Sequence, residues 1–88
     1  MRFTDLEISE AVEMKLWNKH RVDLSEVDQV LHGHPRVRRG PENLYYIYGR
    51  TIAGRYLLVI MADLGAGHAR LVTARDMSHS ERRAYWEQ

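Results

Sequence analysis

The uninterrupted apolar run from Tyr56 to Ala62 constrains the fold of this chain more than any other stretch. Its seven residues match the length of one strand and fall far short of the ~20 residues of a membrane-spanning helix. An apolar strand without polar alternation is typical of a strand that is buried on both faces. We therefore expect a central strand here, with odd-numbered side chains on one face and even-numbered side chains on the other.

Three further strands are expected beside the central one. Arg70–Arg75 alternates in the period-2 pattern of a strand, and Arg36–Arg39 and Leu44–Tyr48 are separated by the turn-forming sequence Gly-Pro-Glu-Asn. Because consecutive segments are joined by short turns, these strands predict an antiparallel meander. Residues 3–8 fit either a short strand or an extended lead-in.

Two helices are expected before these strands. Residues 9–20 have a broad apolar face, start with the candidate N-cap Ser9, and end with basic residues, which favour a helix C-terminus. In the segment 22–31, Asp23 and Glu26 have the spacing of a capping box, in which each side chain accepts from the other residue's backbone N–H. We predict one helix over each segment.

A third helix is expected after the last strand, where Ser78 and Glu81 form a second capping box. The predicted order of elements is ααββββα. This order indicates the α+β class, with a small antiparallel sheet of about four strands packed with two N-terminal helices and one C-terminal helix. With 88 residues, the chain is expected to form a single domain over residues 1–88.

The composition excludes several classes of protein. The chain contains no cysteine, which excludes disulfides and thiolate metal sites. Its first residues have no apolar stretch of signal-peptide length, and no run is long enough to cross a membrane. We therefore expect a cytoplasmic protein that makes no contact with a membrane.

Charge is unevenly distributed along the chain. Residues 1–31 carry four Lys or Arg against seven Asp or Glu, and residues 32–88 carry nine Arg against five Asp or Glu. Arginine presents a planar guanidinium that pairs well with phosphate. This bias suggests an anionic partner, although an ordinary solvated surface explains it equally well.

Arginine and tyrosine are expected to meet at one end of the sheet. Arg50 and Arg55 flank the turn before the central strand, and a hairpin between the last two strands would place Arg55 near Arg75. Tyr45 and its neighbours add aromatic rings on the adjacent strand. Basic groups beside aromatic rings suit single-stranded RNA, whose bases stack and whose phosphates pair with arginine. The alternative is that the tyrosines simply pack in the core and at the sheet edge.

The histidines and the missing motifs narrow the chemistry. His32 and His34 have the spacing of a metal-binding pair but lack a nearby third ligand, so no metal site is predicted. His20, beside Lys19, either stabilises a helix end or transfers protons near pH 7. The sequence has no Ser-His-Asp pattern, phosphate-binding glycine loop or carboxylate pair. Cleavage of RNA by its own 2′-OH needs a base, an acid and cations, and so fits the residues that are present.

Three segments carry a resemblance to a known family. They read Lys-His-x-Val-x-x-x-Glu-Val-x-x-Val over residues 19–30, Gly-Arg-Thr-x-x-Gly-Arg-Tyr-Leu over residues 49–57, and Val-Thr-Ala-Arg-Asp-Met-x-x-x-Glu-Arg-x-x-Tyr over residues 72–85. In this order and spacing they resemble the BrnT family of bacterial toxins. The resemblance extends from about residue 15 to the end of the chain.

The resemblance implies a RelE-like fold and a metal-independent endoribonuclease that arrests translation without a cofactor. It also implies a cognate antitoxin that blocks the toxin and through which the toxin reaches operator DNA. By motif match, the site residues are catalytic His20, Arg55 and Arg75, with His20 as the proton-transfer group, and RNA-binding Lys19, Arg50 and Arg82. Tyr45 and Arg39 join the RNA-binding group because of their positions on the neighbouring predicted strands. Glu26 and Glu81 also match the family, but their expected capping roles already explain them.

One position departs from the resemblance. Many members of the family open the second strand with Glu-Arg, whereas this chain has Asn43 and Leu44. Either Arg39 replaces the missing arginine from across the hairpin, or activity is weak or lost. The sequence thus leaves two main functions open, an RNA-cleaving toxin and an inactive RelE-like module that binds an antitoxin or nucleic acid. A small interaction domain without a nucleic-acid role, and the formation of a homodimer, also stay open.

Overall fold

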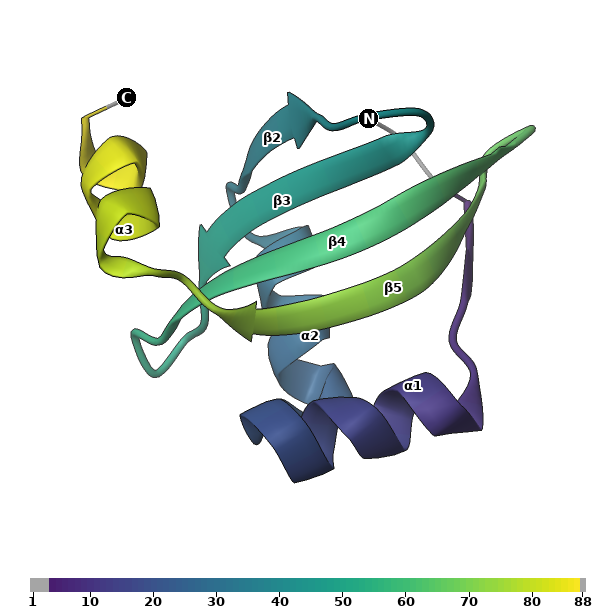
Figure 1. Ribbon diagram of the computed structural model, residues 1–88, viewed down its shortest axis with the longest axis horizontal. Coiled ribbons are helices and arrows are strands. Elements are labelled where there is room, and N and C mark those ends of the chain that lie inside the picture. Colours follow the sequence, from purple (N-terminus) through teal and green to yellow (C-terminus); the bar gives the residue numbers. More distant parts are fainter. Residues whose placement is uncertain (1–3, 88) are drawn as a thin grey trace.

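The apolar run lies at the centre of a five-stranded sheet in the computed structural model, which describes residues 4–87 (Figure 1). The strands are arranged in the order β1-β5-β4-β3-β2. Their bounds are Asp5–Glu7 for β1, Arg36–Arg39 for β2, Leu44–Arg50 for β3, Tyr56–Gly65 for β4 and His68–Asp76 for β5. The expected central strand is therefore confirmed.

Strands β2 to β5 form the expected antiparallel meander, and β1 adds a strand that pairs parallel to β5. The sheet is thus mixed and has five strands rather than about four. Strand β1 has three residues, and its partner is distant in the sequence, with Leu6 opposite Ala69. Local patterning carries no information about such a pairing. Residue 3 of the expected segment 3–8 lies outside the described residues.

All three capping signals read from the sequence are present. The side chain of Ser9 accepts a hydrogen bond from the Val12 amide (3.1 Å), and Asp23 and Ser78 each begin a reciprocal capping box. The helices are α1 (Glu10–Lys15), α2 (Leu24–His32) and α3 (His79–Trp86). Helix α2 starts two residues later than predicted, because Asp23 is its N-cap.

The expected N-terminal helix changes character in its second half. Its last turn is a π-helix, η1 (Leu16–His20), which ends at Arg21 in a left-handed conformation with φ of 52°. A non-glycine residue in this region is uncommon and needs support from its surroundings. The support comes from a hydrogen-bonding partner of the Arg21 carbonyl, which belongs to the site described below.

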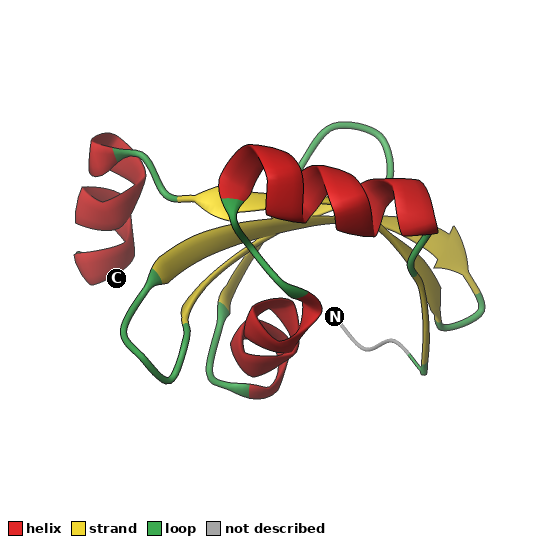
Figure 2. Cartoon of the chain, turned by 90° about the horizontal axis from the view of Figure 1, so that it is seen from below, coloured by secondary structure: helices red, strands yellow, loops and turns green. Residues whose placement is uncertain are grey.

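Strand register divides the sheet into a covered face and an open face. Ile47 on β3 pairs with Val59 on β4, and both side chains are completely buried. The next pair, Tyr48 with Leu58, points to the opposite side. Helix α2 packs on β3 and β4, and α1 with η1 packs on β5, whereas α3 stands beyond the strand ends (Figures 1 and 2). We call the side of Ile47 the helix face and the side of Tyr48 the open face.

The hydrophobic core occupies the helix face. Its buried side chains come from η1, α2, β3, β4 and β5 and the segment between η1 and α2: Leu16, Val22, Val27, Val30, Ile47, Leu57, Val59, Met61, Ala69, Leu71 and Ala74. On the open face Leu58 is buried, but Ile60 is only half-buried. The three helices therefore cover one face well and the other only in part. None of the described helices has the length and apolar character needed to span a membrane.

Gly49 is a position where β3 closely approaches Val30 of α2. A Cβ atom placed there would lie 2.9 Å from Cγ1 of Val30. We expect Gly49→Ala to overpack this contact and to lower the free energy of unfolding by about 1–3 kcal/mol, as measured by urea denaturation. The double variant with Val30→Ala should lose less than the sum of the two single losses, because the clash is relieved. Strict additivity would contradict the contact.

Candidate functional site

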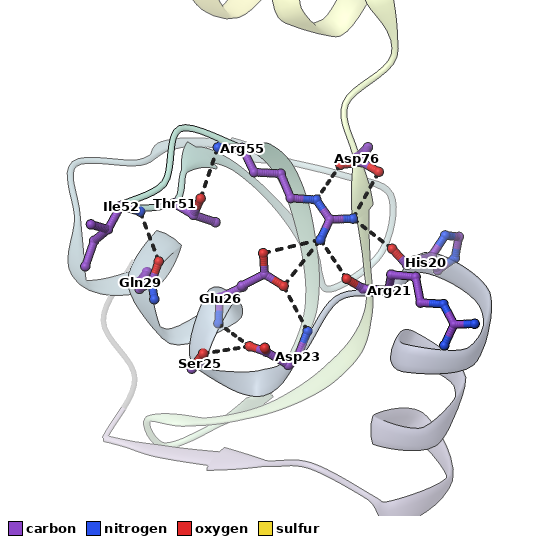
Figure 3. Close-up of polar contacts among 10 residues, drawn as sticks. All are labelled: His20, Arg21, Asp23, Ser25, Glu26, Gln29, Thr51, Ile52, Arg55 and Asp76. Carbon is purple, nitrogen blue, oxygen red and sulfur yellow. Dashed lines mark hydrogen bonds and ion pairs between the residues drawn. The ribbon is translucent and has the colours of Figure 1, made fainter.

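The guanidinium group of Arg55 is held by three separate segments of the chain (Figure 3). Its Nε and Nη2 donate to the two carboxylate oxygens of Asp76 (2.7 and 3.1 Å), and its Nη1 donates to the carboxylate of Glu26 (3.3 Å). The backbone carbonyls of His20 and Arg21 accept from Nη2 and Nη1 (2.8 and 2.7 Å). All five N–H groups of an arginine side chain therefore have an acceptor here.

These contacts give Arg55 a structural role that the sequence prediction did not anticipate. The prediction made it a catalytic phosphate binder beside Arg75, but no N–H group is left for a phosphate. The contacts instead join the end of η1, the start of α2 and the end of β5. The ion pair raises the pKa of Arg55 and holds the pKa of Asp76 below its usual range.

Arg75 lies on the open face, where its backbone pairs with Leu58. Its Nη1 and Nη2 donate to the two carboxylate oxygens of Glu81 at the start of α3 (2.8 and 3.0 Å), and Nη1 also donates to the carbonyl of Asp76 (3.0 Å). Its Nε–H and the second N–H of Nη2 have no acceptor among residues 4–87. Arg75 therefore differs from Arg55, because it keeps donors for an anion.

The carboxylate of Glu81 caps helix α3 and pairs with Arg75 at the same time. One of its oxygens accepts from the amide of Ser78 (2.8 Å) and from Arg75. The pair with Arg75 holds the pKa of Glu81 below its usual range. The capping box therefore fixes the start of α3 and the orientation of Arg75 through one carboxylate.

A groove of about 210 Å³ lies on the open face between β2, β3 and α3. It is lined by Arg36, Arg38, Tyr48, Ser80, Glu81, Ala84 and Tyr85. Antiparallel pairing places Arg36 opposite Tyr48 and so sets arginine beside tyrosine on this face. Burial, followed by the negative charge of Glu81, raises the pKa of Tyr48, so its hydroxyl keeps its proton at neutral pH. The groove combines cations and a hydroxyl donor with Glu81, whose carboxylate holds Arg75.

Two further arginines stack on an aromatic ring next to this groove. The guanidinium carbons of Arg50 and Arg82 lie 4.8 and 4.3 Å from the centre of the Tyr56 ring. The rings of Tyr56, Tyr85 and Trp86 contact one another, with centroids 6.0 to 6.3 Å apart. We call these five residues the arginine–aromatic cluster.

Tyr45 and Arg39, which the sequence also assigned to RNA binding, lie on the helix face. Tyr45 packs against the core, and Arg39 pairs with it across β2 and β3 and stacks on its ring at 5.0 Å. Arg39 therefore does not replace an arginine of the open face, where strand register places Arg38 instead. Asn43, the departure from the family pattern, donates to the carbonyl of Asp63 (2.7 Å) and fastens β3 to β4.

Lys19 and His20 lie at the end of η1, beside the end of β5. Lys19 is exposed and His20 is half-buried. Burial lowers the pKa of His20, the positive charges of Lys19, Lys15 and Arg75 lower it further, and Asp76 opposes them. The imidazole is therefore largely neutral at pH 7 and able to accept a proton.

Several residues of the open face had no site role in the sequence prediction, although Tyr48 was noted among the aromatic rings and Tyr85 as a match to the family. These are Arg36, Arg38, Tyr48 and Tyr85 in the groove, and Tyr56 and Trp86 in the arginine–aromatic cluster. The period-2 alternation of β2 and β3 could have identified the residues on these two strands. It places Arg36 and Arg38 on the face opposite Arg39, and Tyr48 on the face opposite Tyr45. The position of α3 carried no signal, since it depends on tertiary contacts.

No metal-binding arrangement is found within residues 4–87, where no three His, Cys, Asp or Glu side chains converge. His32, half of the His-x-His pair, contacts Asp28 one turn earlier in α2 (3.0 Å). The candidate site thus consists of arginines, aromatic rings and single carboxylates.

Comparison with solved structures identifies a protein of similar architecture. The crystal structure of the Brucella abortus ribonuclease toxin BrnT matches with a TM-score of 0.69 and 16% sequence identity, covering 85% of this chain and 97% of that chain. The chain has the BrnT fold. The resemblance found in the sequence is therefore confirmed at the level of the fold, and the BrnT fold agrees with the α+β class expected above. No protein-family model and no curated protein sequence matches the chain.

We expect Arg55 to stabilise the fold far more than an exposed arginine of the same sheet. Arg55→Ala should lower the free energy of unfolding by about 2–3 kcal/mol, because it leaves Glu26, Asp76 and two carbonyls without their donor. The matched control is Arg70→Ala, which removes an exposed ion pair with Glu7 and should change stability by less than about 0.5 kcal/mol. Equal losses in the two variants, measured by urea denaturation, would refute the structural role of Arg55.

Proposed function

We propose that this chain is a metal-independent endoribonuclease toxin that cleaves RNA through attack of the RNA's own 2′-OH on the adjacent phosphate. The observation that carries the proposal is the open-face groove. There the carboxylate of Glu81 holds Arg75, and Arg38 and Tyr48 line the same surface. The fold adds support, because a ribonuclease toxin shares it.

The groove offers the cations and the proton donor that this reaction requires. The 2′-OH loses its proton and attacks phosphorus, negative charge grows on the phosphate oxygens, and the 5′-oxygen leaves with a proton. In our proposal Arg38 and the two unoccupied N–H groups of Arg75 donate to the phosphate oxygens and stabilise the added charge. Tyr48 donates its hydroxyl proton toward the leaving oxygen. The products are a 2′,3′-cyclic phosphate and a 5′-hydroxyl.

We assign proton acceptance to His20, because its pKa is lowered and its ring carries no hydrogen bond to residues 4–87. Lys19 adds positive charge at the same helix end and is assigned to the RNA backbone. Arg50 and Arg82 keep the RNA-binding role expected from the sequence, whereas Arg55 supports the end of η1, which carries His20.

Growth on expression tests the proposal. We expect the wild-type chain to arrest growth and, when purified, to cleave single-stranded RNA in the presence of EDTA. Arg75→Gln should reduce cleavage by about 10²–10³-fold, because it removes a donor to the charged phosphate. Arg70→Gln on the same strand should not reduce it. Thermal unfolding shows whether both variants are folded, and equal activity of folded wild-type and Arg75→Gln protein would contradict the assignment.

The pH profile tests the role of His20. As pH falls through the lowered pKa of His20, the imidazole gains a proton and can no longer act as a base. The rate should therefore fall on the acid side with a midpoint below the unperturbed value of about 6.5. His20→Gln should remove this acid limb. A limb that persists in the folded His20→Gln protein would assign the base elsewhere.

The second candidate is an inactive binding module with the same fold. The observation that favours it is the departure at Asn43, whose side chain serves the hairpin rather than an RNA substrate. A chain that leaves growth and RNA intact at high expression would support this candidate over the enzyme.

We further propose a cognate antitoxin as the protein partner, with operator DNA reached only through it. Apolar side chains exposed on the surface support a protein partner, among them Met14 and Trp17 on the N-terminal helical segment and Ile52 in the turn before β4. Co-expression of the neighbouring reading frame should suppress growth arrest. A homodimer and a cytoplasmic location remain expectations from the sequence.

A further inference from the structure

Arg50 and Arg82 differ from Arg55 and Arg75 in their partners. Arg55 and Arg75 are each paired with carboxylates, whereas the side chains of Arg50 and Arg82 form no ion pair and no hydrogen bond within residues 4–87. Both are held by the Tyr56 ring instead. A guanidinium stacked on a ring keeps the N–H groups at its edge available, so both residues can donate to phosphate.

Trp86 provides an exposed aromatic surface beside these arginines. It lies at the end of α3, and 61% of its surface is exposed. Its ring is supported by Tyr56 and Tyr85, with centroid distances of 6.0 and 6.3 Å, and the Arg50 guanidinium lies 5.8 Å from its centre. A supported and exposed indole is a suitable surface for a stacked nucleobase.

The arginine–aromatic cluster is continuous with the groove of the open face. Tyr85 belongs to both, because it lines the groove and contacts Tyr56. Arg36, another lining residue, stacks on the Tyr85 ring at 5.5 Å. A strand bound in the groove can therefore extend onto the cluster without leaving the protein surface.

We infer that the arginine–aromatic cluster is a binding subsite for an unpaired nucleotide of single-stranded RNA, next to the scissile position. The base stacks on Trp86, and the phosphate accepts hydrogen bonds from Arg50 and Arg82. The inference takes the class of substrate from the proposed function. It adds a second binding position, where the strand is held without being cut.

The fluorescence of Trp86 tests this subsite directly. The chain has two tryptophans, so in a Trp17→Phe background Trp86 is the sole reporter. The probe is a short single-stranded RNA with 2′-O-methyl groups, which cannot undergo attack by a 2′-OH. We expect saturating probe to quench the emission of Trp86 through base stacking. Binding without a change in emission, or no binding at all, would overturn the inference.

Two adjacent arginines of α3 provide matched variants. Arg82→Ala should raise the Kd for the probe about tenfold and reduce the slope of log Kd against log salt by about 1, because it removes a phosphate contact. Arg83→Ala removes the same charge from the same helix but not from the cluster, and should raise the Kd less than about twofold. Equal effects of the two variants would show that the positive charge of α3 acts without a specific contact, and would refute the subsite.

The failure of this inference can be separated from the failure of the proposed function. Cleavage of unmodified RNA without quenching of Trp86 leaves the function intact and removes the subsite. Quenching and selective loss of affinity in Arg82→Ala without any cleavage leaves the subsite intact and removes the nuclease. Trp86→Phe, which retains an aromatic ring, should bind more tightly than Trp86→Ala, whereas a role in folding alone would give both variants the affinity of the parent.

Discussion

The guanidinium of Arg55 is the contact on which the arrangement of this small protein depends. It neutralises Glu26 and Asp76. It also stabilises a strained helix end, because it donates hydrogen bonds to the carbonyls of His20 and Arg21. Arg21 has a left-handed backbone, and Arg55 compensates for that conformation. One side chain thereby joins the neighbouring ends of η1 and α2 to the end of β5, which is distant in sequence. A lysine could not do this, because it lacks the planar set of five donors.

In our proposal, one face of the sheet maintains the fold and the other binds RNA. Side chains on the helix face form the core, and those on the open face present Tyr48, Arg75 and their neighbours to solvent. The period-2 alternation of strands makes this division possible in a chain of 88 residues, because one strand can serve both purposes at once. Two neighbouring residues on β5 illustrate this division, because their side chains point to opposite faces. Arg75 pairs with Glu81 on the open face, and Asp76 pairs with Arg55 on the other side.

The sequence predicted those features of the fold that depend on local chemistry. The apolar run gave β4, and the Asp23 and Ser78 boxes gave the starts of two helices, because both patterns act over a few residues. Strand β1 was left undecided, since its parallel partner lies more than 60 residues away. The π-helical turn of η1 was not predicted, because its support comes from Arg55, which lies in the distant turn before β4.

The site was predicted less completely than the fold, for a related reason. A motif shows which arginines occur, but burial and partners decide what each can do. Arg55 and Arg75 looked equivalent in the sequence, yet one has every donor occupied and the other keeps two. Tyr45 and Arg39 were assigned without attention to strand parity, which places them on the helix face.

We propose that RNA binds on the open face and reaches Lys19 and His20 at the end of η1, while the core on the helix face only maintains the fold. Amide chemical shifts of the labelled protein, measured by NMR during titration with 2′-O-methyl RNA, test it most directly. We predict changes concentrated at Arg38, Tyr48, Arg75 and along α3, with α2 and its contacts on β3 unaffected. Changes confined to α1 and α2, with the groove of the open face unaltered, would contradict the account.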